Sequence, residues 1–173
     1  MTESIQVRPA VEADAQAVAD IHAASAQAAY ADAIPEARPS ALAPEKRLHY
    51  WREAIEYGEP QVWLATADRK PVGFVGFDRS RDPKSKATTG EIWAIYSLES
   101  HWDRGVGLAL WDAAREGLLA EECTQVTVWV PLRNERALRF FELAGFKREL
   151  PTARTTVVGG VKIEEIRLKR ALS

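Results

Sequence analysis

The chain has 173 residues and a mass of 19.3 kDa, a size that one domain with one hydrophobic core accounts for. Hydrophobic residues make up 46% and charged residues 28% of it, which excludes a disordered or a fibrous protein. The formal net charge of -2 gives the chain no positive field that would attract nucleic acid. We therefore expect a single domain over residues 1–173 and no nucleic-acid partner.

The cysteine content and the hydropathy indicate the compartment. The single cysteine, Cys123, cannot form an internal disulfide or a multi-thiolate metal site. The chain has no run of 18 consecutive apolar residues, and its N-terminus has no apolar stretch of signal-peptide length. The three histidines are too widely spaced for a recognisable metal site. We expect a cytoplasmic protein with no membrane partner and no bound metal.

Hydrophobic periodicity and turn residues predict an alternation of strands and helices. Ala17, Ile21, Ala24 and Ala28 recur at helical spacing, and the prolines between residues 35 and 44 separate this first helix from a second one. The expected elements are, in order, a strand at 5–9, a helix around 17–28 and a second over 45–56, strands at 62–67, 71–77 and from about 91, a helix from 106, a strand at 125–130, a helix at 134–143 and strands at 146–156 and 161–169. This order predicts an α/β fold, of the three-layer α+β type, with a mixed sheet.

The segment Glu91 to Ala109 carries the clearest chemical signal. A strand leads through a short loop into a helix whose first turn holds Gly105 and Gly107. A helix N-terminus exposes unpaired N–H groups at the positive end of its dipole, and glycine lets a ligand approach the backbone. The pattern predicts a pyrophosphate site, although two glycines also suit a simple tight turn. Leu110 stands where a dinucleotide motif needs its third glycine, which argues against a Rossmann fold.

This segment resembles the acetyl-CoA-binding core of the GNAT superfamily of N-acetyltransferases, whose signature is Q/R-x-x-G-x-G/A. Residues 104–109 match the signature. Residues 102–107 also match it at both glycine positions, but Trp102 stands at the position of Gln or Arg. A second resemblance lies in residues 134–146, NERALRFFELAGF, against N-x-x-A-x-x-F-Y-x-x-x-G-F. Phe141 occupies the tyrosine position and has no hydroxyl to donate.

The resemblance implies a GNAT-like fold, with a mixed, mostly antiparallel central sheet flanked by helices, and acetyl-CoA as cosubstrate. The residues it implies for binding acetyl-CoA are Ile95, Tyr96, Ser97, Asp103, Arg104, Gly105, Val106, Gly107, Leu108, Asn134 and Phe141. The arginines at 133, 136 and 139 would either reach the 3'-phosphate or form a solvated helix face.

The resemblance also implies direct transfer of the acetyl group to an amine, which must be neutral to attack. Glu91, at the start of the central strand, is the candidate general base acting through water, and its alternative is a solvated strand-end carboxylate. The period of two places residues 91, 93, 95 and 97 on one face of that strand. Tyr96, Ser97 or a water would return a proton to the leaving thiolate.

The resemblance also implies that aromatic residues line the part of the cleft that would bind the acceptor amine. Tyr30 and Trp93, together with Tyr50 and Trp51, favour a small or partly apolar primary amine. His22 lies on a helix that would border this cleft, although a lone histidine is more often structural. A non-catalytic acyl-CoA-binding module and a protein N-terminal or lysine acetyltransferase are the alternatives. The exposed edge of the terminal hairpin suits a homodimer.

Overall fold

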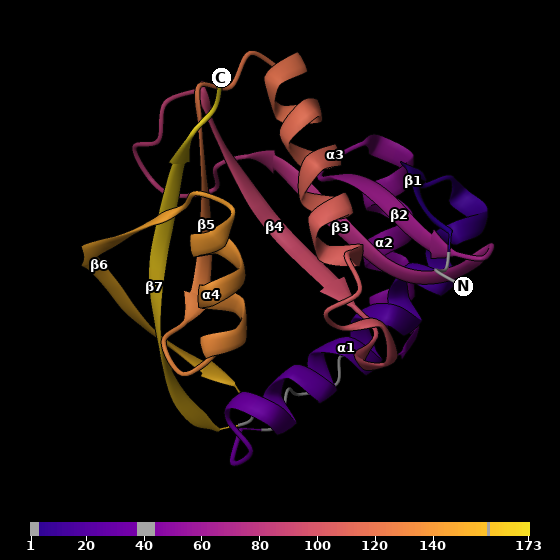
Figure 1. Ribbon diagram of the computed structural model, residues 1–173, viewed down its shortest axis with the longest axis horizontal. Coiled ribbons are helices and arrows are strands. Elements are labelled where there is room, and N and C mark those ends of the chain that lie inside the picture. Colours follow the sequence, from indigo (N-terminus) through magenta and orange to yellow (C-terminus); the bar gives the residue numbers. More distant parts are fainter. Residues whose placement is uncertain (1–3, 38–43, 159) are drawn as a thin grey trace.

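The computed structural model describes residues 4–37, 44–158 and 160–173, and it shows a seven-stranded sheet with helices on both faces (Figure 1). The elements are β1 (Ile5–Pro9), α1 (Ala15–Ala33), α2 (Pro44–Tyr57), β2 (Gln61–Ala67), β3 (Lys70–Arg79), β4 (Thr89–Ser97), α3 (Val106–Ala120), β5 (Gln125–Pro131), α4 (Glu135–Leu143), β6 (Lys147–Val158) and β7 (Val161–Ala171). Two short 3-10 helices, η1 (Glu12–Asp14) and η2 (Glu99–His101), precede α1 and α3. The predicted order of strands and helices is confirmed.

The sheet has the strand order β1-β2-β3-β4-β5-β7-β6, and every neighbouring pair is antiparallel except β4 with β5. This parallel pair is short, because only residues 89–91 of β4 meet residues 125–127 of β5. Beyond that point the two strands diverge, as Figure 1 shows. The mixed, mostly antiparallel sheet is the one expected, and its divergence leaves the last residues of β4 without a partner strand on the β5 side.

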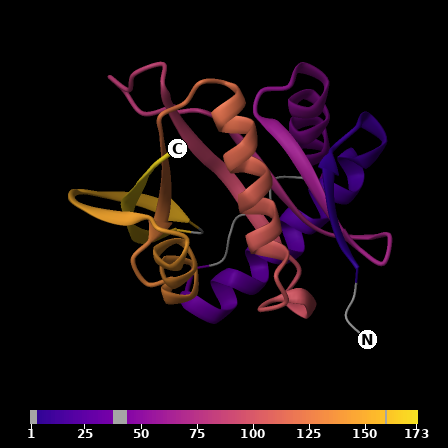
Figure 2. The same cartoon turned by 45° about the horizontal axis from the view of Figure 1, so that its top comes forward.

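Two hydrophobic cores lie on opposite faces of the sheet. The larger one joins the sheet to α3 and α4, and the other joins it to α1 and α2. Figures 1 and 2 show α3 in front of the sheet and α1 behind it. Helix α3 belongs to the larger core because its apolar residues recur at helical spacing and are buried, namely Val106, Leu110, Trp111, Ala114 and Leu118.

An irregularity in β4 changes which side chains share a face. Val75 of β3 pairs with Ile95 and Phe77 pairs with Ile92, so β4 has one residue more than β3 between these pairs. Ile92 and Ile95 therefore both pack against the α3 core. The expectation that residues 91, 93, 95 and 97 share one face is wrong, because the bulge interrupts the period of two and leaves Glu91 on the face opposite to Ile95.

The ends of the sheet are β1 and β6. The β6 strand is largely exposed and pairs on one side with β7, so it presents the free edge on which the predicted homodimer depends. The homodimer stays a prediction. In the part of the chain that the structure describes, no helix combines the length and the apolar character that crossing a membrane requires.

Candidate active site

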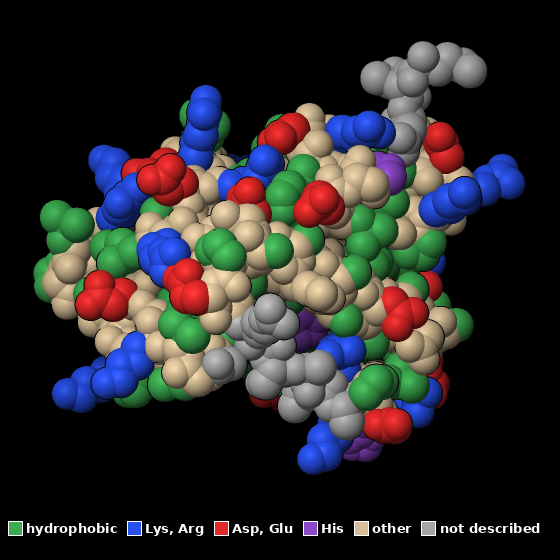
Figure 3. All heavy atoms as spheres, turned by 90° about the horizontal axis from the view of Figure 1, so that it is seen from below, with side chains coloured by type: hydrophobic (Ala, Val, Ile, Leu, Met, Phe, Trp, Pro, Cys, Tyr) green, Lys and Arg blue, Asp and Glu red, His purple; other side chains and the backbone are tan. Residues whose placement is uncertain are grey.

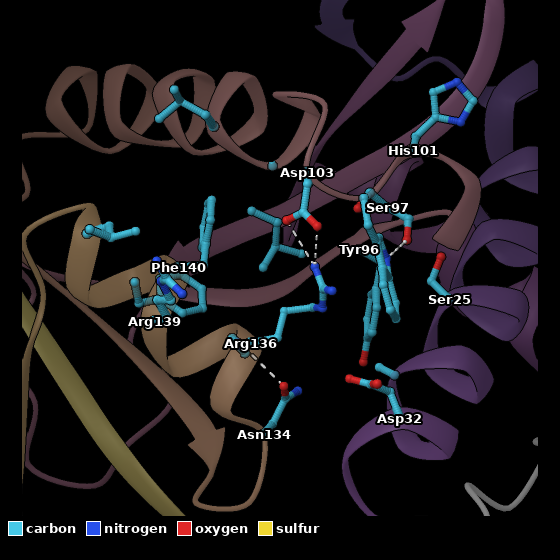
Figure 4. Close-up of a pocket in the computed structure, with 18 of the residues that line it drawn as sticks. Ser25, Asp32, Tyr96, Ser97, His101, Asp103, Asn134, Arg136, Arg139 and Phe140 are labelled. Carbon is cyan, nitrogen blue, oxygen red and sulfur yellow. Dashed lines mark hydrogen bonds and ion pairs between the residues drawn. The ribbon is translucent and has the colours of Figure 1, made fainter.

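A cavity of about 890 Å³ opens where β4 and β5 diverge (Figure 4). Its walls come from β4, from the loop before α3 and the first turn of α3, from α4, and from α1. Of the residues predicted to bind the cofactor, those that line this cavity are Ile95, Tyr96, Ser97, Asp103, Gly105, Gly107, Leu108, Asn134 and Phe141. Arg104 and Val106 are absent from its lining. Arg104 is exposed, and the Val106 side chain is buried in the α3 core, so Val106 has only its backbone to offer a ligand.

The first turn of α3 faces this cavity. Gly105 precedes the helix with φ of 88°, a left-handed conformation that favours glycine, and its carbonyl accepts the first helical hydrogen bond, from the Ala109 N–H at 3.1 Å. The N–H groups of residues 106–108 therefore have no partner within the helix. Gly107 lies against the Phe140 ring of α4, where a Cβ atom would stand 3.2 Å from the ring. A side chain at position 107 would fill the space between α3 and α4.

The side chains of Trp102 and Asp103 connect the loop before α3 to β4 and α4 by hydrogen bonds. The Trp102 indole N–H donates to the Ser97 carbonyl at 3.0 Å, so the residue that departs from the family signature fixes the loop to the end of β4. Asp103 accepts two hydrogen bonds from Arg136 of α4, at 3.0 and 3.1 Å, and the guanidinium stacks 4.4 Å from the Trp102 ring centre. Figure 4 shows the Arg136–Asp103 ion pair at the cavity wall. An anion at the first turn of α3 would therefore meet both a cation and a carboxylate.

Asn134 caps α4, since its Oδ1 accepts the Ala137 N–H at 3.1 Å. Because Oδ1 of Asn134 already accepts this bond, the Nδ2 amide is the group with which Asn134 can donate to a ligand. Phe141 is buried in the α3 and α4 core, where its ring packs against Phe146 and Phe140. Phe141 therefore contributes an apolar wall to the cavity.

The β4 wall carries Tyr96, and α1 supplies Ser25 opposite to it (Figure 4). Burial raises the pKa of Tyr96 to about 12, with smaller contributions from Tyr30 and Glu165. Its phenol is therefore protonated at neutral pH and can donate a hydrogen bond. Ser25 is 2% exposed, and its Oγ has no hydrogen-bond partner among the described residues. Sequence reasoning missed Ser25, because a serine within an alanine-rich helix carries no distinguishing pattern.

Glu91 does not line this cavity. Its side chain is 2% exposed and accepts from Arg81 three times: from the backbone N–H at 2.9 Å, from Nη2 at 2.6 Å and from Nε at 3.4 Å. The Arg81 guanidinium in turn stacks on the Trp93 ring, 4.2 Å from its centre. The expected alternative, a solvated strand-end carboxylate, is wrong, because Glu91 is buried in an ion pair with Arg81. The role of general base stays a prediction.

A second cavity, of about 200 Å³, lies on the α1 and α2 side of β4. It is lined by His22, Arg47, Tyr50, Trp51, Trp93, Ala94 and Tyr96. Tyr96 belongs to the walls of both cavities. The predicted acceptor residue Trp93 lines this second cavity, whereas Tyr30 lines neither and packs instead against the small cluster of Ile34 and Ile163.

Comparison with known proteins identifies the class. The family model described as acetyltransferase (GNAT) family matches residues 26–146, and the chain belongs to this family. It is therefore an N-acetyltransferase of the GNAT class, as the two motifs implied.

Three individual proteins are similar to it. YuaI of Bacillus subtilis, an uncharacterized N-acetyltransferase, is 27% identical over 165 residues, which cover 95% of this chain and 91% of YuaI. Mycothiol acetyltransferase of Acidimicrobium ferrooxidans is 31% identical over 96 residues, 55% of this chain and 31% of that protein. The structure of YncA from Salmonella typhimurium, with its cofactor acetyl-CoA, shares the fold with a TM-score of 0.75 at 17% identity. That match covers 98% of this chain and 94% of YncA.

Proposed function

We propose that this protein transfers the acetyl group of acetyl-CoA to the primary amine of a small molecule, by direct attack of the amine on the thioester. The single observation that carries the proposal is that Tyr96 lines both cavities. One cavity has the size and the donor groups for a coenzyme, and the other has the size of a small acceptor. The reacting atoms would meet beside Tyr96.

The large cavity offers acetyl-CoA a distinct contact at each part of the molecule. The N–H groups of residues 106–108 suit the pyrophosphate, since they point out of the positive end of α3. Asn134 Nδ2 suits an amide carbonyl of the pantetheine arm. The unpaired end of β4, residues 95–97, offers backbone groups to the same arm and an N–H that would stabilise the developing oxyanion.

In the transfer itself the amine nitrogen attacks the thioester carbonyl carbon, the C–S bond breaks and CoA leaves as a thiolate. The amine loses one proton, which passes to the thiolate directly or through water. With its high pKa, Tyr96 acts here as a hydrogen-bond donor to the sulfur and keeps its own proton.

The environment of Glu91 supports a positioning role in place of the predicted base. Its carboxylate holds Arg81, and Arg81 stacks on Trp93 in the wall of the second cavity. A base must lie within hydrogen-bond reach of the proton that it removes, directly or through one water. In this proposal Glu91 acts on the acceptor through Arg81 and Trp93.

A protein acceptor is the second candidate. On the face of the molecule seen in Figure 3, acidic and basic side chains are interspersed, so this face offers no field of one sign to steer a strongly basic protein target. The small size of the second cavity further favours a small molecule.

The test is release of the CoA thiol from acetyl-CoA in the presence of a panel of small amines, with the acetylated product identified by mass spectrometry. Acetylation of at least one small amine is the expected result. Acetyl-CoA binding without release of CoA beyond the rate of hydrolysis would favour the non-catalytic module. Acetylation only of peptides with a free N-terminus or lysine would favour a protein acetyltransferase.

A further inference from the structure

The second cavity combines one cationic side chain with mainly aromatic walls. Arg47 of α2 lines it, no acidic residue is among the described residues that line it, and aromatic rings from α2 and β4 form most of the rest. Arg47 lies near His22, another residue of the cavity wall, and its charge contributes to lowering the pKa of His22 after the larger effect of burial. A guanidinium has five N–H donors in a fixed fork, and this geometry suits an anionic group of a substrate better than an ammonium group.

His22 supplies a second donor, and its tautomer follows from the structure. The Trp51 indole N–H donates to His22 Nδ1 at 3.2 Å, so Nδ1 carries a lone pair and the proton of the neutral ring is on Nε2. Burial, with a smaller contribution from Arg47, lowers the pKa of His22 to about 4. At neutral pH His22 is therefore an uncharged N–H donor and has no lone pair on Nε2 with which to act as a base.

The surroundings hold His22 in this state. Its ring packs against Trp51, Phe74 and Tyr96 at centre distances of 5.7, 6.3 and 5.1 Å. The other titratable groups lining the cavity are Arg47 and the phenols of Tyr50 and Tyr96, none of which is a carboxylate. The cavity thus pairs a cation with a fixed neutral donor, a combination that suits an oxyanion with two acceptor oxygens.

We propose that the second cavity binds a carboxylate of the acceptor at Arg47 and His22, so that the acceptor is an amine that carries its own carboxylate, as an amino acid does. The volume of about 200 Å³ lies below that of pockets for drug-sized ligands, which limits the acceptor to a compact molecule. The carboxylate end lies in the second cavity, and the amine extends past Tyr96 toward the thioester. The inference rests on the proposed acetyl transfer to a small amine.

The kinetic test compares leucine, methionine and phenylalanine with their carboxamides and with the corresponding amines that lack the carboxylate. We expect kcat/KM to be at least tenfold higher for the amino acid in the best set. We expect Arg47→Gln to raise KM for that amino acid by about 10- to 100-fold, the loss of one charge-assisted hydrogen bond. KM for its carboxamide and for acetyl-CoA should stay within about threefold. Arg52→Gln, on the same helix, is the matched control.

His22→Gln and its control His49→Gln test the second donor. His49 is exposed on α2 and pairs with Glu53. We expect His22→Gln to weaken the preference for the amino acid over its carboxamide by about tenfold, and His49→Gln to leave it unchanged. Equal kcat/KM values for the carboxylate and carboxamide forms in the wild type would overturn the proposal, as would an unchanged preference in Arg47→Gln.

A binding experiment separates this inference from the proposed function. Calorimetric titration of the CoA complex with N-acetyl-leucine, N-acetyl-methionine or N-acetyl-phenylalanine, each against its carboxamide, needs no turnover. Tighter binding of an acid than of its carboxamide, lost in Arg47→Gln, would support the anion site even if no small amine were acetylated. Acetylation of the simple amines, with no preference for the acids in this titration, would leave the proposed function standing and refute the inference.

Discussion

Replacing Glu91 by Gln decides between a base and a positioning residue. Glutamine keeps the shape of the side chain and removes its charge, so the contact with the Arg81 guanidinium loses one charge-assisted hydrogen bond of about 1.5–3 kcal/mol. Arg81 is 50% exposed and recovers part of this from water, which reduces the expected loss of stability to about 1–2 kcal/mol. For a domain of this size that loss lowers Tm by about 2–8 °C.

Kinetically, the same substitution should raise KM for the amine by a few-fold while kcat falls by less than about tenfold. The physical reason is that Arg81, once loosened, no longer stacks on Trp93 in the wall of the second cavity, which leaves the indole held by its hydrogen bond to the Arg79 carbonyl at 3.1 Å. The assay is steady-state release of CoA at saturating acetyl-CoA with the amine varied, together with thermal unfolding of the same preparation.

Glu149→Gln is the matched control for stability, because Glu149 binds Arg167 with two hydrogen bonds of 2.9 and 3.1 Å and lines neither cavity. It should lower Tm similarly without changing KM for the amine. A fall of kcat by 100-fold or more in Glu91→Gln, with Tm unchanged, would refute the positioning role. Such a fall is what the loss of a general base produces.

Three further outcomes are expected. Ser25→Ala should raise KM for acetyl-CoA or for the amine by about 2- to 13-fold at unchanged Tm, because a ligand would satisfy the buried hydroxyl; unchanged kinetics would make Ser25 a packing residue. Asp103→Asn should tighten acetyl-CoA binding by up to about fivefold in a calorimetric titration, since it removes a carboxylate and releases Arg136 for the phosphates; weaker binding would show that the ion pair preorganises the site. The pKa of His22 is lowered from 6.5 to about 4, so the unfolded chain binds a proton that the folded one does not. Stability present above pH 6.5 is lost as the pH falls toward 4, by up to about 3 kcal/mol. A comparison of Tm at pH 7 and pH 5 should show a smaller drop in His22→Gln than in the wild type, and equal drops would contradict the assignment.

Much of the fold could be predicted because local signals agreed with one another. The buried face of α3 has apolar residues at helical spacing, and Gly105 stands where the chain needs a positive φ before the helix. The glycine turn and Asn134 lie on separate elements in the sequence, and the divergence of β4 from β5 places both on one cavity. These motifs were recognisable because the backbone geometry itself requires those residue types.

The remaining features depend on contacts that local patterns do not encode. The bulge in β4 adds one residue and reverses the face of Glu91 relative to Ile95, and nothing in the alternation of that strand signals it. The partner of Glu91, Arg81, comes from a polar loop whose path is set by tertiary packing. The donor role of His22 depends on a hydrogen bond from Trp51 on another helix, so only the folded structure reveals it.

The most direct test of the central claim is thermal unfolding of the wild type, Gly107→Val and Asp112→Val with and without acetyl-CoA at 100 times its Kd for the wild type. Binding at that ratio adds about 2.7 kcal/mol, a rise of about 5–11 °C in Tm. We expect this rise in the wild type and in Asp112→Val, an exposed position of α3 outside the cavity. We expect it to be lost in Gly107→Val, whose side chain would crowd Phe140, and NADH should raise none of the three. No rise in the wild type, or the same rise in Gly107→Val, would contradict acetyl-CoA binding at the first turn of α3.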